Sequence, residues 1–132
     1  MSYVINQSRK LLISQLKTEL NYRLMMIKAR MDLTQMRTQD ISRQKTTIQN
    51  QELERLVEKG TENITIEDIQ SIAAKTSDLD VQLDLLAIKD SNWESEMKMI
   101  ESQIQSLNAE EEQIEKAIDS AVKKEFGIFS GN

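Results

Sequence analysis

The sequence lacks the residues that most often interrupt helices or create reactive sites. It contains no proline, no cysteine and no histidine, and only three glycines among 132 residues. With no proline and so little glycine, long stretches hold nothing that would stop a helix. The absence of cysteine and histidine excludes disulfides, thiolate and imidazole metal sites, and the most common general base. These absences favour long helices and argue against an enzyme.

Aromatic residues and long apolar runs are also scarce. Aromatic side chains make up 4% of the chain, too few to supply the buried area of a typical globular core. The longest apolar run within residues 1–20 is Leu11, Leu12 and Ile13, which is shorter than the apolar segment of a signal peptide. No stretch approaches the roughly 18 apolar residues that span a bilayer. The sequence therefore predicts no membrane span and no cleavable signal peptide.

Helical patterns lie on both sides of one turn. We predict a helix over residues 2–58, a turn over 59–65, a second helix over 66–126 and a short C-terminal tail. Gly60 can adopt the left-handed conformation that ends a helix. Thr65, which two acidic residues soon follow, is suited to cap the next helix. Two helices of similar length joined by a short turn form an antiparallel hairpin, because neither can bury its apolar stripe alone.

The second predicted helix carries the clearest pattern in the sequence. Apolar residues alternate at spacings of four and three, with interruptions at Asp90, Glu111 and Glu125. Such a repeat, sustained over successive heptads, predicts a coiled-coil seam. The fold class we predict is all-α, a long antiparallel two-helix coiled-coil hairpin that forms a single elongated domain over residues 1–132. The predicted intrachain seam consists of Leu79, Leu83, Leu86, Trp93, Met97, Ile100, Ile104, Leu107, Ile114 and Ile118.

The first predicted helix is less regular. Its seam passes through Leu16, Leu20 and Leu24, with an extra residue between the last two that would locally unwind the supercoil. Charge supports the pairing of the helices, because residues 1–59 hold 11 basic and 6 acidic side chains, whereas residues 60–132 hold 6 basic and 16 acidic ones. In the second helix, Ser77 and Asp80 imitate a capping box. The sequence leaves open whether that helix breaks there.

Apolar residues are concentrated at the end of the hairpin that carries both termini. They cover more than one face of the first helix, so some must face away from the second helix. A surface of this kind is larger than soluble monomers usually expose. Residues 34–62, by contrast, are mostly polar and are expected to be solvated. The predicted assembly interface comprises Ile5, Leu12, Met25, Met26, Phe126, Ile128 and Phe129.

No catalytic, cofactor-binding or metal-binding residue is predicted. The acidic run Glu110, Glu111 and Glu112 has the pattern of a solvated helix face, not of a metal site. Basic residues in the first helix are interleaved with its seam and matched by an acidic second helix, so we expect no nucleic-acid partner. Asp90, a single polar residue within an apolar seam, is expected to fix the register of the helices.

In architecture the sequence resembles the helical-hairpin subunits of bacterial secreted filaments, namely type III secretion needles and filaments and the terminal coiled coil of flagellins. The shared features are paired terminal helices, apolar termini, no cysteine and a polar turn. The resemblance implies a structural subunit that self-assembles with copies of itself into a helical filament or tube. It also implies a location outside the cell or at its surface, reached without a cleavable signal peptide. The alternative is a non-polymerising coiled-coil stalk or chaperone, in the cytoplasm, whose partner is a secretion-apparatus protein.

Overall fold

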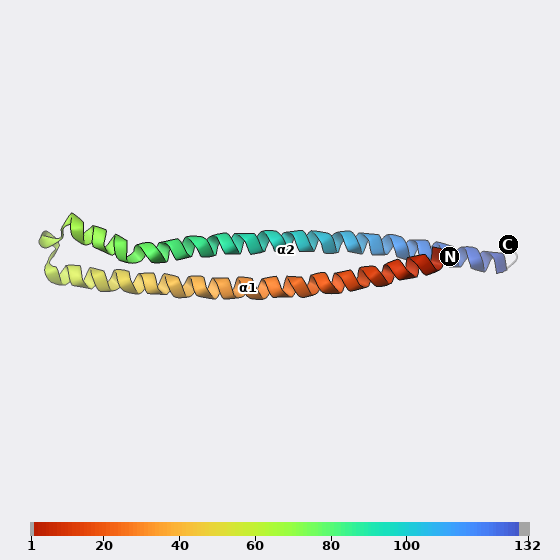
Figure 1. Ribbon diagram of the computed structural model, residues 1–132, viewed down its shortest axis with the longest axis horizontal. Coiled ribbons are helices and arrows are strands. Elements are labelled where there is room, and N and C mark those ends of the chain that lie inside the picture. Colours follow the sequence, from red (N-terminus) through yellow and green to blue (C-terminus); the bar gives the residue numbers. More distant parts are fainter. Residues whose placement is uncertain (1, 130–132) are drawn as a thin grey trace. The chain divides into compact units, whose positions relative to one another are not determined.

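The computed structural model describes residues 2–129, with side chains for residues 3–127. Helix α1 (Ser2–Lys59) is followed by a short 3-10 helix, η1 (Thr61–Asn63), and by helix α2 (Ile66–Phe129). No residue between 2 and 129 belongs to a strand. The two long helices pack against each other (Figure 1). The all-α helical hairpin that the sequence predicts is therefore confirmed.

The two helices extend beyond their predicted ends. Helix α1 continues through Lys59, and α2 continues through Gly127 to Phe129. A glycine within a helix costs only about 1 kcal/mol relative to alanine, and no proline follows to end the helix. The prediction that a non-helical tail begins at Gly127 was therefore wrong.

Helix α2 is continuous through the segment in which the sequence leaves a break open. The Thr76 hydroxyl donates to the carbonyls of Ile72 and Ala73 at 3.2 and 3.3 Å, so it bonds within the helix and does not cap a new one. A threonine that bonds back one turn often bends a helix. Figure 1 shows α2 changing direction in this green part of the chain.

The chain divides into two compact units, each built from both helices. Unit 1 comprises Met1–Lys28 and Ser95–Asn132, and unit 2 comprises Ala29–Glu94. Within each unit the α1 and α2 segments run antiparallel and side by side (Figure 1). Each unit buries a few aliphatic side chains between its helices, namely Ile13, Ile27, Ile100 and Ile114 in unit 1 and Ile41, Leu56 and Leu86 in unit 2.

Burial along α2 follows the predicted spacing of four and three. All ten predicted seam residues are buried or half-buried, from Leu79 to Ile118, and Trp93 is half-buried among them. Asp90 and Glu111, which interrupt the apolar pattern, are half-buried at the seam positions between them. The seam therefore keeps its phase through the polar positions.

Burial along α1 differs from the prediction at one point. Leu16 is exposed, and Lys17 occupies the half-buried position. With Lys17 in the seam, the spacing runs through Leu20 and Leu24 without an extra residue, so the predicted stutter was wrong. A lysine can take a seam position because its aliphatic stem covers apolar surface while its amine remains at the edge. The Lys17 amine reaches Glu111 of α2 at 2.9 Å.

The turn between the helices is built as the sequence predicts, around Gly60 and Thr65. Gly60 has a φ of 91°, a value that favours glycine, and Asn63 donates its side-chain amide to the Lys59 carbonyl at 3.1 Å. Thr65 caps α2, because its hydroxyl accepts from the Asp68 N–H while the Asp68 carboxylate accepts from the Thr65 N–H at 3.0 Å. These reciprocal bonds form a capping box.

The capping box should be visible in the titration of Asp68. The Thr65 N–H and then the Lys59 amine, 2.9 Å away, lower the pKa of Asp68 from 3.8 to about 2. Because the folded-state value lies below the unfolded one, the carboxylate stabilises the fold fully above about pH 4, and this contribution is lost as the pH falls towards 2. In a carboxyl-detected NMR titration we expect a midpoint near the lower value, and a higher midpoint in Lys59→Gln. An ordinary midpoint in the unsubstituted chain would contradict the capping box.

Candidate interaction surface

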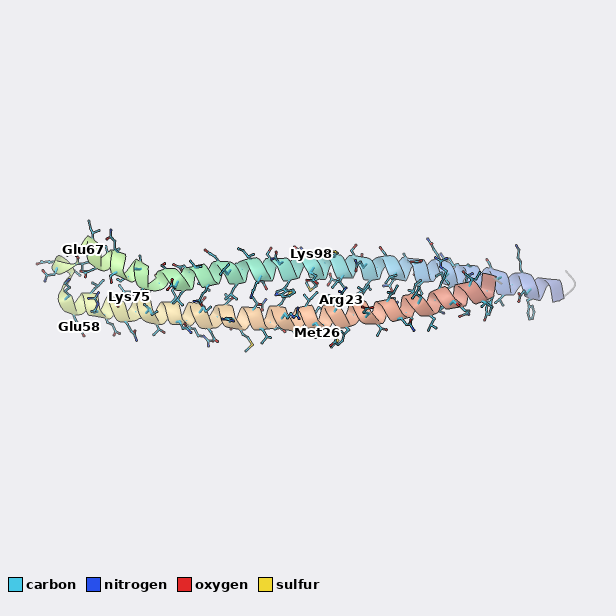
Figure 2. The ribbon with its side chains drawn as sticks, in the orientation of Figure 1. Arg23, Met26, Glu58, Glu67, Lys75 and Lys98 are labelled. Carbon is cyan, nitrogen blue, oxygen red and sulfur yellow. The ribbon has the colours of Figure 1, made fainter. Side chains whose placement is uncertain are left out.

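Helix α1 of unit 1 carries a second apolar face on the side that points away from α2. This outer α1 face consists of adjacent pairs that recur along the helix, namely Val4 and Ile5, Leu11 and Leu12, and Met25 and Met26. All six are exposed, with exposed fractions from 41% for Met26 to 69% for Met25. The pairs are separated by multiples of two helical turns, so they align along one face. Figure 2 shows Met26 on the side of α1 away from α2.

The structure brings four of the seven predicted interface residues together on this face, Ile5, Leu12, Met25 and Met26. Phe126 is 75% exposed and lies near the C-terminal end of α2. The side chains of Ile128 and Phe129 lie outside the described residues. Apolar groups gathered on one exposed face usually mark an interaction site.

The seam behind the outer α1 face is held in register by charge. The buried Ile13 lies between two lysines on α1, and the buried Ile114 lies between two glutamates on α2. Exposed ion pairs contribute only about 0.2–1 kcal/mol each, so they align the helices more than they stabilise them. Three pairs join the helices here: Arg9 with Glu110 (2.9 Å), Lys10 with Glu115 (3.3 Å) and Lys17 with Glu111 (2.9 Å).

Glu110 and Glu111 of the acidic run on α2 thus pair with α1. Among the side chains of residues 3–127, no cluster of three or more acidic groups could hold a metal ion. Several basic residues of α1 likewise pair with carboxylates, namely Arg9, Lys10, Lys17, Lys45, Arg55 and Lys59. The Arg30 guanidinium instead lies 5.2 Å from the centre of the Trp93 ring. Such a contact is typical of cation–π pairing.

Sequence reasoning missed an apolar patch beside the turn. Leu53, Val57 and Ile69 are all at least half exposed in unit 2, and the first two lie within the mostly polar segment of residues 34–62. We call these three residues the turn-side patch. Each follows an inward-facing residue by one position, as Leu53 follows Glu52. Extending the α1 seam as far as Leu56 would have revealed them.

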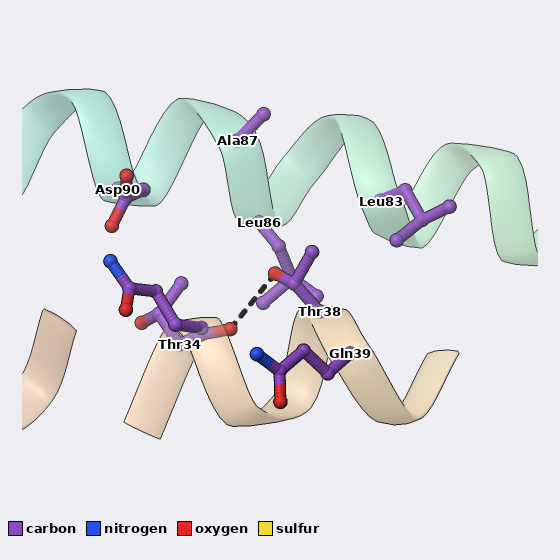
Figure 3. Close-up of a pocket in the computed structure, with 8 residues that line it drawn as sticks. Thr34, Thr38, Gln39, Leu83, Leu86, Ala87 and Asp90 are labelled. Carbon is purple, nitrogen blue, oxygen red and sulfur yellow. Dashed lines mark hydrogen bonds between the residues drawn. The ribbon is translucent and has the colours of Figure 1, made fainter. Parts of the chain in front are cut away.

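The seam of unit 2 is interrupted by a polar cavity at Asp90. The cavity measures about 380 Å³ and is lined by Thr34, Gln35, Thr38, Gln39, Leu83, Leu86, Ala87 and Asp90. In Figure 3 Asp90 faces α1 across this gap, while Thr38 bonds back to the Thr34 carbonyl at 2.8 Å. One Asp90 carboxylate oxygen is buried and has no hydrogen-bond partner among the described residues. An unsatisfied buried oxygen of this kind destabilises the seam.

Glu52 is a buried acid of unit 2, and both of its carboxylate oxygens have a basic partner. It forms an ion pair with Lys75 of α2 and another with Arg55, which lies 2.9 Å away. The hydrogen bond from Lys75, followed by that from Arg55, lowers the pKa of Glu52. The carboxylate is therefore charged at neutral pH and ties α1 to α2 near the turn.

A further exposed apolar stripe lies on the outer side of α2 in unit 2. Val81, Leu85 and Ile88 are each more than half exposed and follow the spacing of four and three. Leu85 and Ile88 line a groove of about 390 Å³, whose other lining residues include Arg37 and Lys89. The stripe was not among the predicted residues, although its spacing is visible in the sequence.

Within the described part of the chain, neither long helix contains a stretch apolar enough to cross a membrane. No protein-family model, no curated protein and no solved structure matches this chain.

Proposed function

We propose that the chain is a structural subunit that self-assembles through the outer α1 face into a helical filament or tube. The observation that carries this proposal is the exposure of three recurring apolar pairs, ending with Met25 and Met26, on the side of α1 that α2 does not cover. The residues of the seam pack α1 against α2, and the outer α1 face contains none of them. The outer α1 face is therefore a second apolar surface, separate from the seam. Burying it requires another helix.

A copy of the same chain is the partner that the sequence favours. The resemblance to subunits of secreted filaments supports polymerisation, and it also supports a location at the cell surface or outside the cell. The charge difference between the helices also supports contacts between copies, because a basic α1 and an acidic α2 complement each other across molecules as well as within one. Neither catalysis nor a cofactor enters this function.

The test is the sedimentation of the purified chain over a wide range of concentration. We expect particles larger than a dimer at high concentration. Dilution should return them to single chains, because the contact is non-covalent and buries only a few apolar side chains. Negative-stain microscopy of the large species should show filaments or tubes. A chain that sediments as a monomer or dimer at every concentration and salt level would refute the proposal.

The alternative function, a non-polymerising stalk or chaperone of a secretion apparatus, has its own supporting observation. The groove beside Leu85 and Ile88 has an apolar floor and basic neighbours in Arg37 and Lys89. Such a groove suits an amphipathic partner helix with acidic flanks. If this is the function, the isolated chain should remain small and the stripe at Val81 should be needed for partner binding.

A further inference from the structure

We propose that the outer α1 face of one copy docks on the turn-side patch of a second copy, so that the subunits join head to tail. This inference rests on the proposed self-assembly and names the surface that receives the outer α1 face.

The turn-side patch lies on one side of the hairpin. Leu53 and Val57 each follow a buried residue of α1, and Ile69 follows the half-buried Asp68 of α2. One step along a helix turns the side chain by about 100°. Because the helices run in opposite directions, this step leads to the same side of the pair in both. The ion pair between Lys59 and Asp68 places these two residues opposite each other on the two helices. Val57 and Ile69, each within two residues of this pair, therefore lie at nearly the same level along the hairpin.

A hollow in this patch has an apolar floor and an acidic rim. It measures about 510 Å³ and is lined by Leu53 and Val57 together with Asn50, Glu54 and Glu58. Figure 2 shows Glu58 pointing away from α2. An apolar side chain with a basic residue on either side would fit both the apolar floor and the acidic rim of the hollow.

The basic residues nearest to the hollow already have carboxylate partners. Lys59 lies 2.9 Å from Asp68, and Arg55 lies 2.9 Å from Glu52. The rim glutamates, Glu54 and Glu58, therefore keep a negative potential at the hollow. A basic partner would be attracted to it.

The outer α1 face supplies such a partner. Residues 2–28 contain five basic side chains and one acidic side chain. Of the five, Arg9, Lys10 and Lys17 pair with glutamates of α2, which leaves Arg23 and Lys28. Met25 and Met26 lie between Arg23 and Lys28 in the sequence, so an exposed apolar pair has a basic residue on each side. Methionine is unbranched and adapts to irregular apolar hollows. We therefore place Met25 and Met26 of one copy against Leu53 and Val57 of the next.

A contact between two different surfaces has a consequence for assembly. After one copy docks, one of the two copies still presents a free outer α1 face and the other still presents a free turn-side patch. Heterologous contacts of this kind extend into open chains unless the rotation closes a ring. A contact of the outer α1 face with itself would instead stop at a dimer.

Complementation between two variants tests this arrangement. The outer-face variant carries Leu12→Glu and Met26→Glu, and the patch variant carries Val57→Lys. Each should raise the concentration needed for assembly by roughly tenfold or more, because like charges then meet across the contact. Each variant keeps one surface intact, so an equimolar mixture should form a dimer of one of each, detected by sedimentation velocity with one variant fluorescently labelled.

Matched variants on the outer side of α2 provide the controls. Asn92→Lys and Gln105→Glu lie on exposed positions outside both surfaces, and they should assemble as the unsubstituted chain does. Circular dichroism must show unchanged helicity in every variant, and Leu53→Lys serves as the patch variant if Val57→Lys does not fold. Raising NaCl from about 0.15 M to about 1 M should weaken assembly, since the Debye length falls from roughly 8 to 3 Å.

The outcomes separate the two proposals. If the patch variant assembles normally while the outer-face variant does not, the head-to-tail contact is wrong and the proposed function stands. If both variants fail alone and the mixture yields no dimer, the contact is not heterologous and the inference is again wrong. If the unsubstituted chain never assembles, or the outer-face variant assembles normally, the proposed function fails and the inference fails with it.

Discussion

The chain carrying Leu12→Glu and Met26→Glu is expected to remain monomeric at every concentration at which the unsubstituted chain forms large particles. Both positions are exposed on the outer α1 face and neither belongs to the buried core, so neither change removes a buried side chain from the seam. In an assembly, however, the contact would remove each carboxylate from water, at a cost of several kcal/mol per charge. A penalty on the order of 3 kcal/mol already weakens association by roughly 100-fold.

The design keeps the monomer folded. Glutamate at position 26 would lie one turn from Arg23 and one turn from Arg30, and glutamate at position 12 would lie one turn from Arg9. Opposite charges at these spacings stabilise a helix slightly. Circular dichroism should therefore show equal or greater helicity, while sedimentation shows the loss of large species.

A matched variant separates the effect of charge from that of lost apolar area. Leu12→Gln with Met26→Gln removes the same apolar side chains without adding charge, and its assembly should be intermediate. If the glutamate variant assembles at the same concentration as the unsubstituted chain, the outer α1 face does not mediate self-association.

The fold could be predicted from the sequence because the α2 seam is marked by apolar residues at almost every position. From Leu79 to Ile118 the heptad is interrupted only at Asp90 and Glu111, so the phase of the pattern is never lost. The turn was equally clear, because Gly60 and Thr65 are each suited to one backbone conformation. Those features determine an antiparallel hairpin without reference to the rest of the chain.

The α1 seam could not be predicted in the same way because polar side chains occupy it. Lys10, Lys17 and Lys45 are half-buried there, and Thr34 is buried. A pattern search based on apolar residues instead selects Leu16, which is exposed. The partner residues on α2 decide between the two positions, because Lys17 gains an ion pair with Glu111.

The prediction of the two candidate surfaces, the outer α1 face and the turn-side patch, also depended on knowing which residues of α1 lie in the seam. The sequence showed that the N-terminal part of α1 carries more apolar residues than one seam can bury, which pointed to Met25 and Met26. It did not reveal the turn-side patch, because Leu53 and Val57 are isolated apolar residues in a polar segment. Whether such residues face inward or outward becomes clear only when the burial of Glu52 and Leu56 is known.

The Asp90→Leu variant is expected to unfold at a higher temperature than the unsubstituted chain. The change removes a buried carboxylate oxygen that has no partner among the described residues, and it fills part of the cavity opposite Thr34. An unsatisfied buried polar group costs about 1–3 kcal/mol. The expected rise in the thermal midpoint, measured by circular dichroism, is on the order of 5 °C. Asp90→Asn, which keeps the shape and the polarity, should change the midpoint much less.

The gain in stability should come with a loss of register. A polar residue within an apolar seam favours the alignment in which it meets polar partners, and here the cavity offers Thr34 and Thr38. The chain has no cysteine, so nitroxide labels can be attached at Ser42→Cys and Gln82→Cys, both on exposed positions of unit 2. With Asp90 in place we expect one distance between the labels. With Asp90→Leu we expect a second population in which α2 has shifted along α1 by one heptad, about 10 Å.

Two results would contradict this account of Asp90. An unchanged or lower thermal midpoint for Asp90→Leu would mean that the carboxylate is satisfied in the folded chain and contributes to its stability. A single label distance in both chains would mean that the register is set elsewhere, and the ion pairs of Lys45 with Asp80 and of Lys75 with Glu52 are then the groups that set it. Replacing Asp80 by Asn in the Asp90→Leu background should in that case produce the second distance.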